Sequence, residues 1–223
     1  MRIGTWNLDN KWTEKHCALI SEEKCDVWLL TEVNPKAVNV KGGLAGFHWH
    51  LSKGIMTAGQ YWAAFLSLKR FEGFIPHLHP ASAAAVVDGI IYCSTILPWS
   101  GCKKYSPHPW EGDTLEEMTK AAIEPLENIS PRSGFVWGGD WNQNLIGNWE
   151  YVGSKGKRKT LESAIKSFRL TVATADLPHQ LGNGHHTIDH VAVPSQWKVT
   201  RKDRIEAKRL STHDAYVIEV HGE

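Results

Sequence analysis

Six polar residues of this chain stand directly beside apolar runs, where the ends of strands would place them. They are Asn7, Glu32, Asp140, Asn142, Asp189 and His213. Strand ends and the loops beyond them often assemble an active site at one edge of a sheet. We therefore expect these six side chains to converge, although the chain spreads them from residue 7 to residue 213.

The residue types in this set suit the hydrolysis of a phosphodiester. A hard divalent cation prefers carboxylate and amide oxygens, and Mg²⁺ often takes only one or two protein carboxylates, for which Glu32 is the natural choice. Asp140 could orient or deprotonate an attacking water, and His213 could donate to a phosphate oxygen as charge builds there. Asp189 could fix the tautomer of His213 by accepting its second ring proton. The two asparagines could supply neutral hydrogen bonds that hold ligands in place.

The elements that would position these residues are helices and strands mixed along the whole chain. Apolar runs of strand length are Arg2–Leu8, Asp26–Thr31, Tyr61–Leu68, Ala84–Ser94, Gly134–Trp137, Ile188–Val193, Trp197–Ile205 and Tyr216–Val220. Helical spacing of apolar residues predicts helices over Lys11–Cys25, after the capping box Thr114–Glu117, and over Thr160–Phe168. No linker divides the chain. We expect one α/β domain over residues 1–223, with two packed sheets and the helices outside.

Composition and charge narrow the class of protein without naming a partner. Hydrophobic residues make up 42% of the 223 residues and charged residues 22%, which suits a globular protein and argues against disorder. The formal net charge of +1 is too small for a protein that simply coats nucleic acid, whereas an enzyme with a substrate cleft needs no basic excess. No apolar run approaches the ~20 residues that cross a bilayer, and no secretory signal precedes the first strand. These features predict a cytoplasmic protein.

The four cysteines, Cys17, Cys25, Cys93 and Cys102, form no Cys-x-x-Cys pair, so neither a zinc ribbon nor a redox motif is indicated. Four reduced thiols are the expectation for a cytoplasmic protein. A bridge between Cys93 and Cys102 remains open on the sequence alone.

Five short motifs carry a resemblance to a known family. In chain order they are Trp6-Asn7-Leu8, Leu30-Thr31-Glu32-Val33, Gly139-Asp140-Trp141-Asn142, Ile188-Asp189-His190-Val191 and Ser211-Thr212-His213. Together they resemble the endonuclease/exonuclease/phosphatase superfamily, whose members include abasic-site endonucleases, pancreatic-type deoxyribonucleases, inositol-phosphate phosphatases and sphingomyelinases. Each motif alone is weak, but the five occur in the family's order and span nearly the whole chain.

The resemblance implies a four-layered α/β/β/α sandwich with two mixed β-sheets and a metal site at their edge. Glu32 is similar in position to the family's metal-binding glutamate, and Asn7 to the asparagine that supports it. Asp140 and Asn142 match the pair that positions the nucleophilic water and the phosphate. The implied cofactor is Mg²⁺, with Mn²⁺ able to replace it.

The last motif both supports the resemblance and departs from it. Asp189 and His213 match the family's orienting aspartate and catalytic histidine, but the usual Ser-Asp-His has Thr212 in place of its aspartate. In an extended segment Thr212 and Asp214 point to the same face, about 6.6 Å apart along the strand. We expect Asp214, or a water held by Thr212, to replace the missing metal ligand. The expected metal residues are therefore Glu32, Asn7 and Asp214.

Candidate substrate contacts lie close to the third motif. Lys157 and Arg158 belong to a basic run over residues 155–159, which is either a solvated loop or an arm that contacts phosphate. Most of the 11 tryptophans are expected in the core, but a base could stack on those in loop-like stretches, namely Trp99, Trp110, Trp141 and Trp149. We take Trp141, Lys157 and Arg158 as the expected substrate-binding residues.

A zinc cluster is the competing interpretation of the histidine-rich segment, which contains His185, His186, Asp189 and His190. In a strand, however, His190 would point away from Asp189. The glycines of residues 153–157 do not have the spacing of a nucleotide P-loop.

The sequence predicts a monomeric, magnesium-dependent hydrolase that cuts a phosphodiester in DNA or RNA by attack of an activated water. Two alternatives remain. The same chemistry could act on a small phosphoester such as a nucleotide or phosphoinositide, which the near-neutral charge and short length favour. A catalytically weakened binding module of the same fold is the other, and Thr212 is its support.

Overall fold

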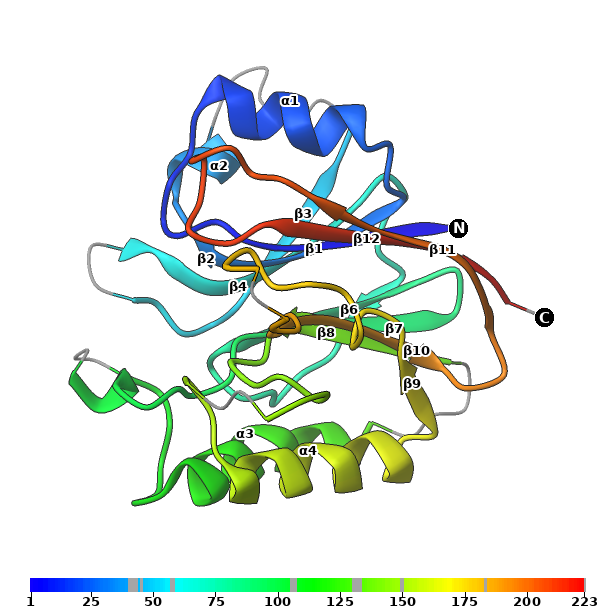
Figure 1. Ribbon diagram of the computed structural model, residues 1–223. Coiled ribbons are helices and arrows are strands. Elements are labelled where there is room, and N and C mark those ends of the chain that lie inside the picture. The colour runs from blue at the N-terminus through cyan, green and yellow to red at the C-terminus, as the bar shows by residue number, and fades with distance from the viewer. Residues whose placement is uncertain are drawn as a thin grey trace.

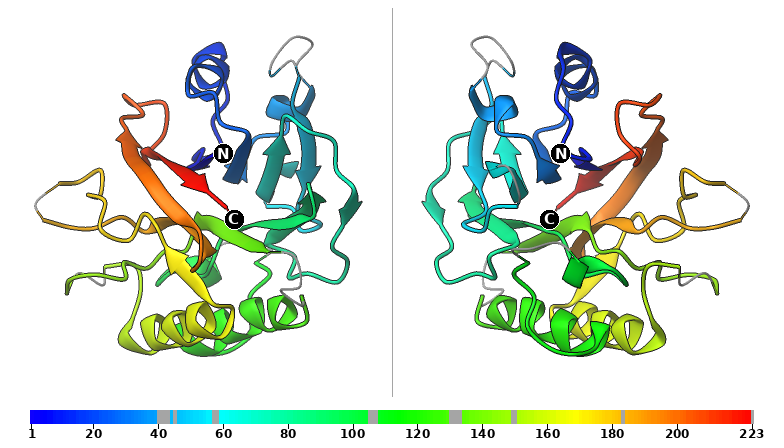
Figure 2. Two further views of the ribbon diagram at one scale, coloured as in Figure 1. Left: turned by 90° about the vertical axis from the view of Figure 1, so that its right-hand side faces the viewer. Right: turned by 90° about the vertical axis from the view of Figure 1, so that its left-hand side faces the viewer.

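Two six-stranded β-sheets pack face to face, and helices cover their outer faces (Figure 1). The computed structural model describes residues 1–39, 44, 46–56, 59–104, 108–129, 134–148, 151–182 and 184–222. The layers follow the order helix, sheet, sheet, helix, as the two turned views in Figure 2 also show. This confirms the four-layered sandwich that the motifs led us to expect.

The first sheet contains both ends of the chain. Its strand order is β11 (Lys198–Ile205), β12 (Ala215–His221), β1 (Arg2–Asn7), β2 (Val27–Val33), β4 (Tyr61–Ser67) and β3 (His48–Leu51). β1 runs parallel to β2, and the other neighbours are antiparallel. The helices on its outer side are α1 (Glu14–Glu22) and α2 (Lys36–Asn39) (Figure 1).

The second sheet has the strand order β5 (Gly73–Phe74), β6 (Ser82–Val87), β7 (Ile90–Thr95), β8 (Phe135–Asp140), β10 (Asp189–Pro194) and β9 (Leu170–Val172). β7 runs parallel to β8, and β8 is antiparallel to β10. Helices α3 (Leu115–Glu127) and α4 (Lys155–Ser167) cover its outer face, and the 3₁₀ turn η2 (Cys102–Lys104) precedes α3.

Strand residues alternate between two apolar layers, which is what a sheet buried on both faces requires. In β2, Val27 and Leu29 enter the core between the sheets, whereas Trp28 and Leu30 pack in the core on the helix side. A third core forms where α3 and α4 cover the second sheet. The buried carboxylates of the central strands, Asp140 and Asp189, lie at strand ends.

The run Ala84–Ser94, expected as one strand, is instead the hairpin of β6 and β7. Its turn is Asp88-Gly89, with φ of 50° and 70°. Asp-Gly is a strong two-residue hairpin signal because both residues tolerate positive φ. The long apolar run concealed this signal.

The helices also differ from expectation at their starts. The first begins at Glu14 instead of Lys11, because Thr13 adopts an extended conformation and caps it. Helix α4 begins at Lys155 and not at Thr160, because the Ser154 hydroxyl accepts from the Lys157 backbone N–H. The capping box expected at Thr114 and Glu117 is confirmed. The short elements α2, β3, β5 and β9 were not predicted, since so few residues carry no clear periodicity.

All four cysteines are free thiols, so Cys93 and Cys102 form no bridge. The Cys102 thiol instead lies 3.9 Å from the sulfur of Met118. In the part of the chain that the structure describes, no helix has the length and apolar character needed to span a membrane.

Gly139 lets β8 pass close to β7 just before Asp140. Its φ is +119°, and an added Cβ would lie 2.3 Å from the Thr95 carbonyl oxygen. Both the backbone conformation and the contact therefore require glycine.

We expect Gly139→Ala to lower the free energy of unfolding by about 2–4 kcal/mol, since backbone strain and overpacking each cost about 1–3 kcal/mol. Urea denaturation would measure the change. Gly73→Ala is the matched control, because Gly73 also lies in a strand but has nothing within 4 Å of an added Cβ. Equal effects for the two substitutions would contradict this explanation.

Candidate functional site

The expected polar residues meet where corresponding ends of the two sheets lie together. Asn7 is the last residue of β1 and Asp140 the last of β8. Asp189 opens β10 and is paired with Asp140 in the antiparallel register. Glu32 lies near the end of β2, and His213 comes just before β12. Each strand thus delivers one polar side chain to the same edge.

Asn7 joins the two sheets through its side-chain amide. Its Nδ2 donates to Glu32 Oε1 at 3.0 Å and to Asp140 Oδ2 at 2.9 Å. Its Oδ1 accepts from the Asp9 backbone N–H at 2.9 Å. Both ends of the amide bond to protein groups, which suits a supporting residue, and the role of Asn7 as a metal ligand stays a prediction.

The second oxygen of Glu32 is held by a residue that the sequence did not single out. Asn10 Nδ2 donates to Glu32 Oε2 at 3.0 Å. Asn10 is three residues beyond Asn7 and has a φ of 56°, and its proximity to the first motif was the one available signal. Two amides therefore orient the Glu32 carboxylate.

Two site residues have strained backbones. Glu32 and Asn142 both adopt a φ of 49°, in the left-handed region that favours glycine. Such conformations cost on the order of 1–3 kcal/mol and persist where the surroundings hold them. Glu32 is the second-last residue of β2, and Asn142 comes two residues after β8.

The segment Asp140–Asn142 is held by its own hydrogen bonds and by Leu97. The Asn142 backbone N–H donates to Asp140 Oδ1 at 2.8 Å, and the Leu97 N–H donates to the Asp140 carbonyl at 2.9 Å. The Asn142 side-chain nitrogen donates to the Leu97 carbonyl at 3.0 Å. The side-chain nitrogen of Asn142 thus bonds to the loop after β7.

His213 and Asp189 form the pair expected between them. His213 Nδ1 donates to Asp189 Oδ2 at 2.8 Å. The loop that carries His213 is anchored to β1, since Ser211 Oγ donates to the Asn7 carbonyl at 2.6 Å and Trp6 Nε1 donates to the His213 carbonyl at 3.0 Å. The His213 side chain is 15% exposed, whereas that of Asp189 is fully buried.

Burial and like charge dominate the electrostatics of the carboxylates. Burial, followed by the charge of Asp189, raises the pKa of Asp140 to about 6. Burial also raises the pKa of Glu32, with a further contribution from Asp140, and that of Asp189. These three carboxylates therefore resist being ionised together unless positive charge lies beside them.

His213 supplies part of that positive charge. Burial alone would lower its pKa, but the charge of Asp189, their hydrogen bond and the charge of Asp140 raise it to about 10. One imidazolium among three carboxylates leaves an excess of negative charge.

The residues of the site fit a divalent cation. Carboxylate oxygens of Asp140 and Asp189 and a ring nitrogen of His213 lie within 4.8 Å of one another. Asp189 Oδ1 is buried and has no hydrogen-bond partner among the described residues. The crowded carboxylates and this oxygen are what a hard cation would relieve, and the Glu32 carboxylate adjoins them through Asn7.

Asp214 does not join this group, contrary to expectation. Its carboxylate accepts from Arg204 Nε at 2.6 Å and from the Ala207 backbone N–H at 2.8 Å. These two contacts hold the Asp214 carboxylate beside the end of β11. Thr212 is exposed, and its carbonyl accepts from Gln180.

The tryptophans expected to stack on a base are largely inaccessible. Trp141 is fully buried, with its ring 4.2 Å from that of Trp137 and 5.0 Å from that of His190. Trp110 is also buried, and half-buried Trp99 packs edge-on against it. Trp149 lies outside the described residues. The prediction of base stacking on Trp141 is therefore wrong, because the side chain fills the core beneath the second sheet.

The basic run is the start of α4 and not a loop that contacts substrate. Lys157 is fully buried, and its ammonium donates to the carbonyl oxygens of Pro98 and Asn142. Arg158 donates to the Gly147 carbonyl at 2.7 Å and to Asn144 Oδ1 at 3.0 Å. Both side chains hold the loop after β8. Lys157 is fully buried, so its assignment as a substrate contact is wrong, whereas that of the half-buried Arg158 stays a prediction.

The histidine-rich segment does not form the alternative zinc cluster. His190 is buried, its Nε2 donates to the Gln143 carbonyl at 2.9 Å, and its Nδ1 lies 3.4 Å from Thr174 Oγ1. His186 Nδ1 donates to the Asp176 carbonyl at 3.2 Å. Among the described residues, the one metal-ligating group of three is the set containing Asp140, Asp189 and His213.

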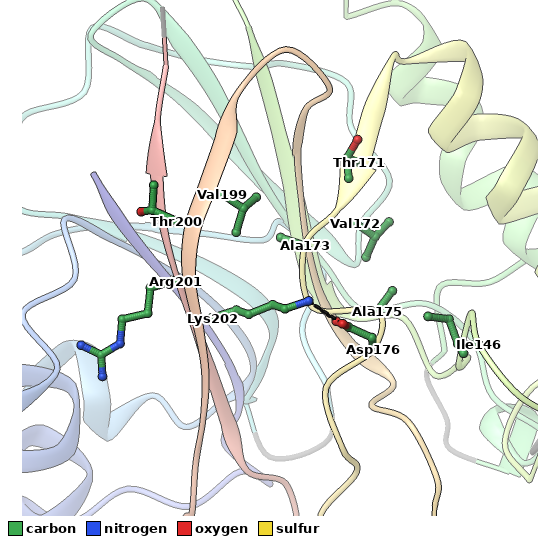
Figure 3. A pocket seen from close by; sticks show the side chains of 10 residues that line it. All are labelled: Ile146, Thr171, Val172, Ala173, Ala175, Asp176, Val199, Thr200, Arg201 and Lys202. Atoms are coloured by element: carbon green, nitrogen blue, oxygen red, sulfur yellow. Dashed lines mark hydrogen bonds and ion pairs between the residues drawn. The ribbon is translucent and has the colours of Figure 1, made fainter.

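Two of the surface hollows are lined in part by the loop after β8. One, of about 450 Å³, opens between β9 and β11, where Lys202 pairs with Asp176 (Figure 3), and none of the candidate catalytic residues lines it. The other, of about 390 Å³, is lined by Asn144, His185 and His186 among others. Its lining residues lie within a few residues of Asn142 and Asp189 in the sequence.

No family model and no curated protein sequence matches this chain. Solved structures do match. A 3′ phosphatase, NExo from Neisseria, bound to a product DNA hairpin, is 16% identical, with 100% of both chains covered and a TM-score of 0.72. An AP endonuclease from Archaeoglobus fulgidus is 15% identical, with 98% of both chains covered and a TM-score of 0.72. An endonuclease/exonuclease/phosphatase protein from Beutenbergia cavernae DSM 12333 is 17% identical over 99% of this chain and 71% of its own, with a TM-score of 0.70.

The Asp189–His213 pair gives a pH prediction for the metal-free protein. We expect NMR titration to show the His213 imidazole protonated until the pH nears about 10, whereas Asp189→Asn should lower its pKa. Because the folded pKa exceeds the ordinary value of 6.5, the stabilisation should be complete below about 6.5 and lost as pH rises through about 10. Asp176→Asn, an exposed carboxylate paired with Lys202, is the control. An unchanged His213 titration in Asp189→Asn would refute the assignment.

Proposed function

We propose that this chain, whose fold is that of the endonuclease/exonuclease/phosphatase superfamily, is a metal-dependent hydrolase that cleaves a phosphodiester in nucleic acid. The observation that carries the proposal is the convergence of Glu32, Asp140 and the Asp189–His213 pair at one edge of the two sheets. A carboxylate cluster beside a partly exposed imidazolium can accept a proton from the attacking water and donate a hydrogen bond to the phosphate.

The residues would divide the chemistry between them. Asp140 holds the attacking water and accepts its proton as the water oxygen bonds to phosphorus and the bond from phosphorus to the leaving ester oxygen breaks. His213, kept protonated by Asp189, donates from Nε2 to a phosphate oxygen as negative charge develops there. Asn7 fixes the orientation of Glu32 and Asp140 relative to each other. A divalent cation such as Mg²⁺, held by Glu32 with oxygens of the aspartates, would supply Lewis-acid polarisation of the phosphate.

Nucleic acid is the substrate class that the similar structures favour. The NExo structure contains a DNA hairpin, and the protein from Archaeoglobus fulgidus is named as an AP endonuclease. A small phosphoester is the second candidate, favoured by the formal net charge of +1, since strong phosphate-backbone binding usually uses a basic surface.

The proposal predicts metal-dependent cleavage that is lost when either Glu32 or His213 is replaced. We expect Glu32→Gln and His213→Ala each to lower turnover about 100-fold or more, since acid–base and charge-stabilising groups contribute about that much. The assay compares supercoiled plasmid, a single-stranded oligonucleotide and a chromogenic phosphodiester, with Mg²⁺, Mn²⁺ or EDTA.

Glu22→Gln and His221→Ala are matched controls, because both residues are exposed and lie outside the site. Cleavage that persists in EDTA, or in both site variants, would contradict the proposal. Turnover of the small diester but of neither nucleic acid would favour the second candidate. Binding of nucleic acid without any turnover would instead support a binding module.

A further inference from the structure

Lys157 is a completely buried lysine that the reaction outlined above does not use. It lies in the first turns of α4, and its ammonium reaches the Pro98 carbonyl and, at 3.1 Å, the Asn142 carbonyl. Removing an ammonium from water is costly unless hydrogen bonds and charge compensate. Burial lowers the pKa of Lys157 to about 7, so a buried amine bonded to two loop carbonyls calls for an explanation.

The two carbonyls belong to the segments that leave β7 and β8, two adjacent parallel strands. Asn142 is two residues beyond Asp140, and Pro98 follows Leu97, which already bonds the Asp140–Asn142 segment from the other side. Lys157 therefore ties the two strand-end segments together from the helix layer. It is one of the contacts by which the start of α4 fixes the backbone that follows Asp140.

The rest of the α4 start acts on the same loop. The Ser154 backbone N–H donates to Gln143 Oε1 at 2.8 Å, and Arg158 bonds residues 144 and 147. Gln143 is also held by His190 through its carbonyl. The loop after Asp140 is thus bonded at several points, and Lys157 holds the point nearest to the carboxylate.

The strained conformation of Asn142 makes this contact consequential. A φ of 49° there is stable only while its neighbours oppose relaxation. The Asn142 N–H donates to Asp140 Oδ1, so relaxation at Asn142 would turn the carboxylate. Displacement of a reacting group by about 1 Å can lower a rate by about 100-fold.

We propose that Lys157 is a positioning residue for the proposed hydrolysis: by bridging the carbonyls of Pro98 and Asn142, it holds the Asp140–Asn142 segment in its reactive conformation. This rests on the proposed function of the same site. The Lys157 side chain is fully buried and bonds two backbone carbonyls, so its effect is transmitted through the backbone.

Lys157→Met tests the proposal, because methionine keeps much of the length and loses the charge and both hydrogen bonds. At a temperature where the variant is fully folded, kcat should fall about 10- to 100-fold while KM changes less than about threefold. Amide hydrogen exchange in the metal-free protein should become at least about tenfold faster at Leu97 and Asn142, as expected for a local loss of protection.

Lys155→Met and Lys159→Met are matched controls, since both lysines are exposed on the same helix. They should leave kcat and both exchange rates within about twofold. If Lys157→Met does not fold, Lys157→Gln, which keeps an N–H donor, takes its place in the same comparison.

Unchanged exchange at Leu97 and Asn142 would overturn the proposal, as would faster exchange with kcat unchanged, because Lys157 would then be structural only. If the wild type cleaves no phosphodiester, the proposed function fails by itself. Exchange in the metal-free variants would still show whether Lys157 holds the segment.

Discussion

The side-chain amide of Asn7 lies between two carboxylates that belong to different sheets, and the arrangement of the site depends on this contact. Glu32 comes from the sheet of β1, and Asp140 comes from the facing sheet. The packing of the two sheets therefore sets the distance between the two acids. The carbonyl of Asn7 accepts from Ser211, which links the same strand end to the loop of His213. One residue thus connects all three parts of the site.

The concentration of buried charge at this edge explains its chemistry. A carboxylate that loses water without gaining a cation favours its neutral form, and the raised pKa of Asp140 expresses that cost. The imidazolium of His213 offsets part of the charge, and the buried Asp189 Oδ1 remains without a partner among the described residues. Crowding of these carboxylates destabilises their ionised forms. The same crowding favours the binding of a cation or a proton, which makes them good ligands and bases.

Much of the fold and of the candidate site could be predicted from the sequence, since buried carboxylates such as Asp140 and Asp189 lie at the ends of apolar strands. The failures came from contacts between segments distant in sequence. A basic run looks solvated unless Ser154 is recognised as a helix cap, and nothing local indicates that Lys157 points into the core. Trp141 lies beside Asp140 in sequence but faces the opposite layer. Asp214 lies two residues after Thr212, as the strand alternation required. Its carboxylate instead pairs with Arg204, whose position depends on the β11–β12 pairing.

The most direct test of the account is to locate a cation in a crystal of the protein grown with Mn²⁺, by anomalous diffraction. Mn²⁺ takes oxygen ligands as Mg²⁺ does and can be identified by its anomalous signal. The account predicts a peak bonded to the Glu32 carboxylate and to at least one aspartate of the Asp140–Asp189 pair. A crystal saturated with Mn²⁺ that shows no peak there, or shows one bonded only to residues outside this edge, would contradict it.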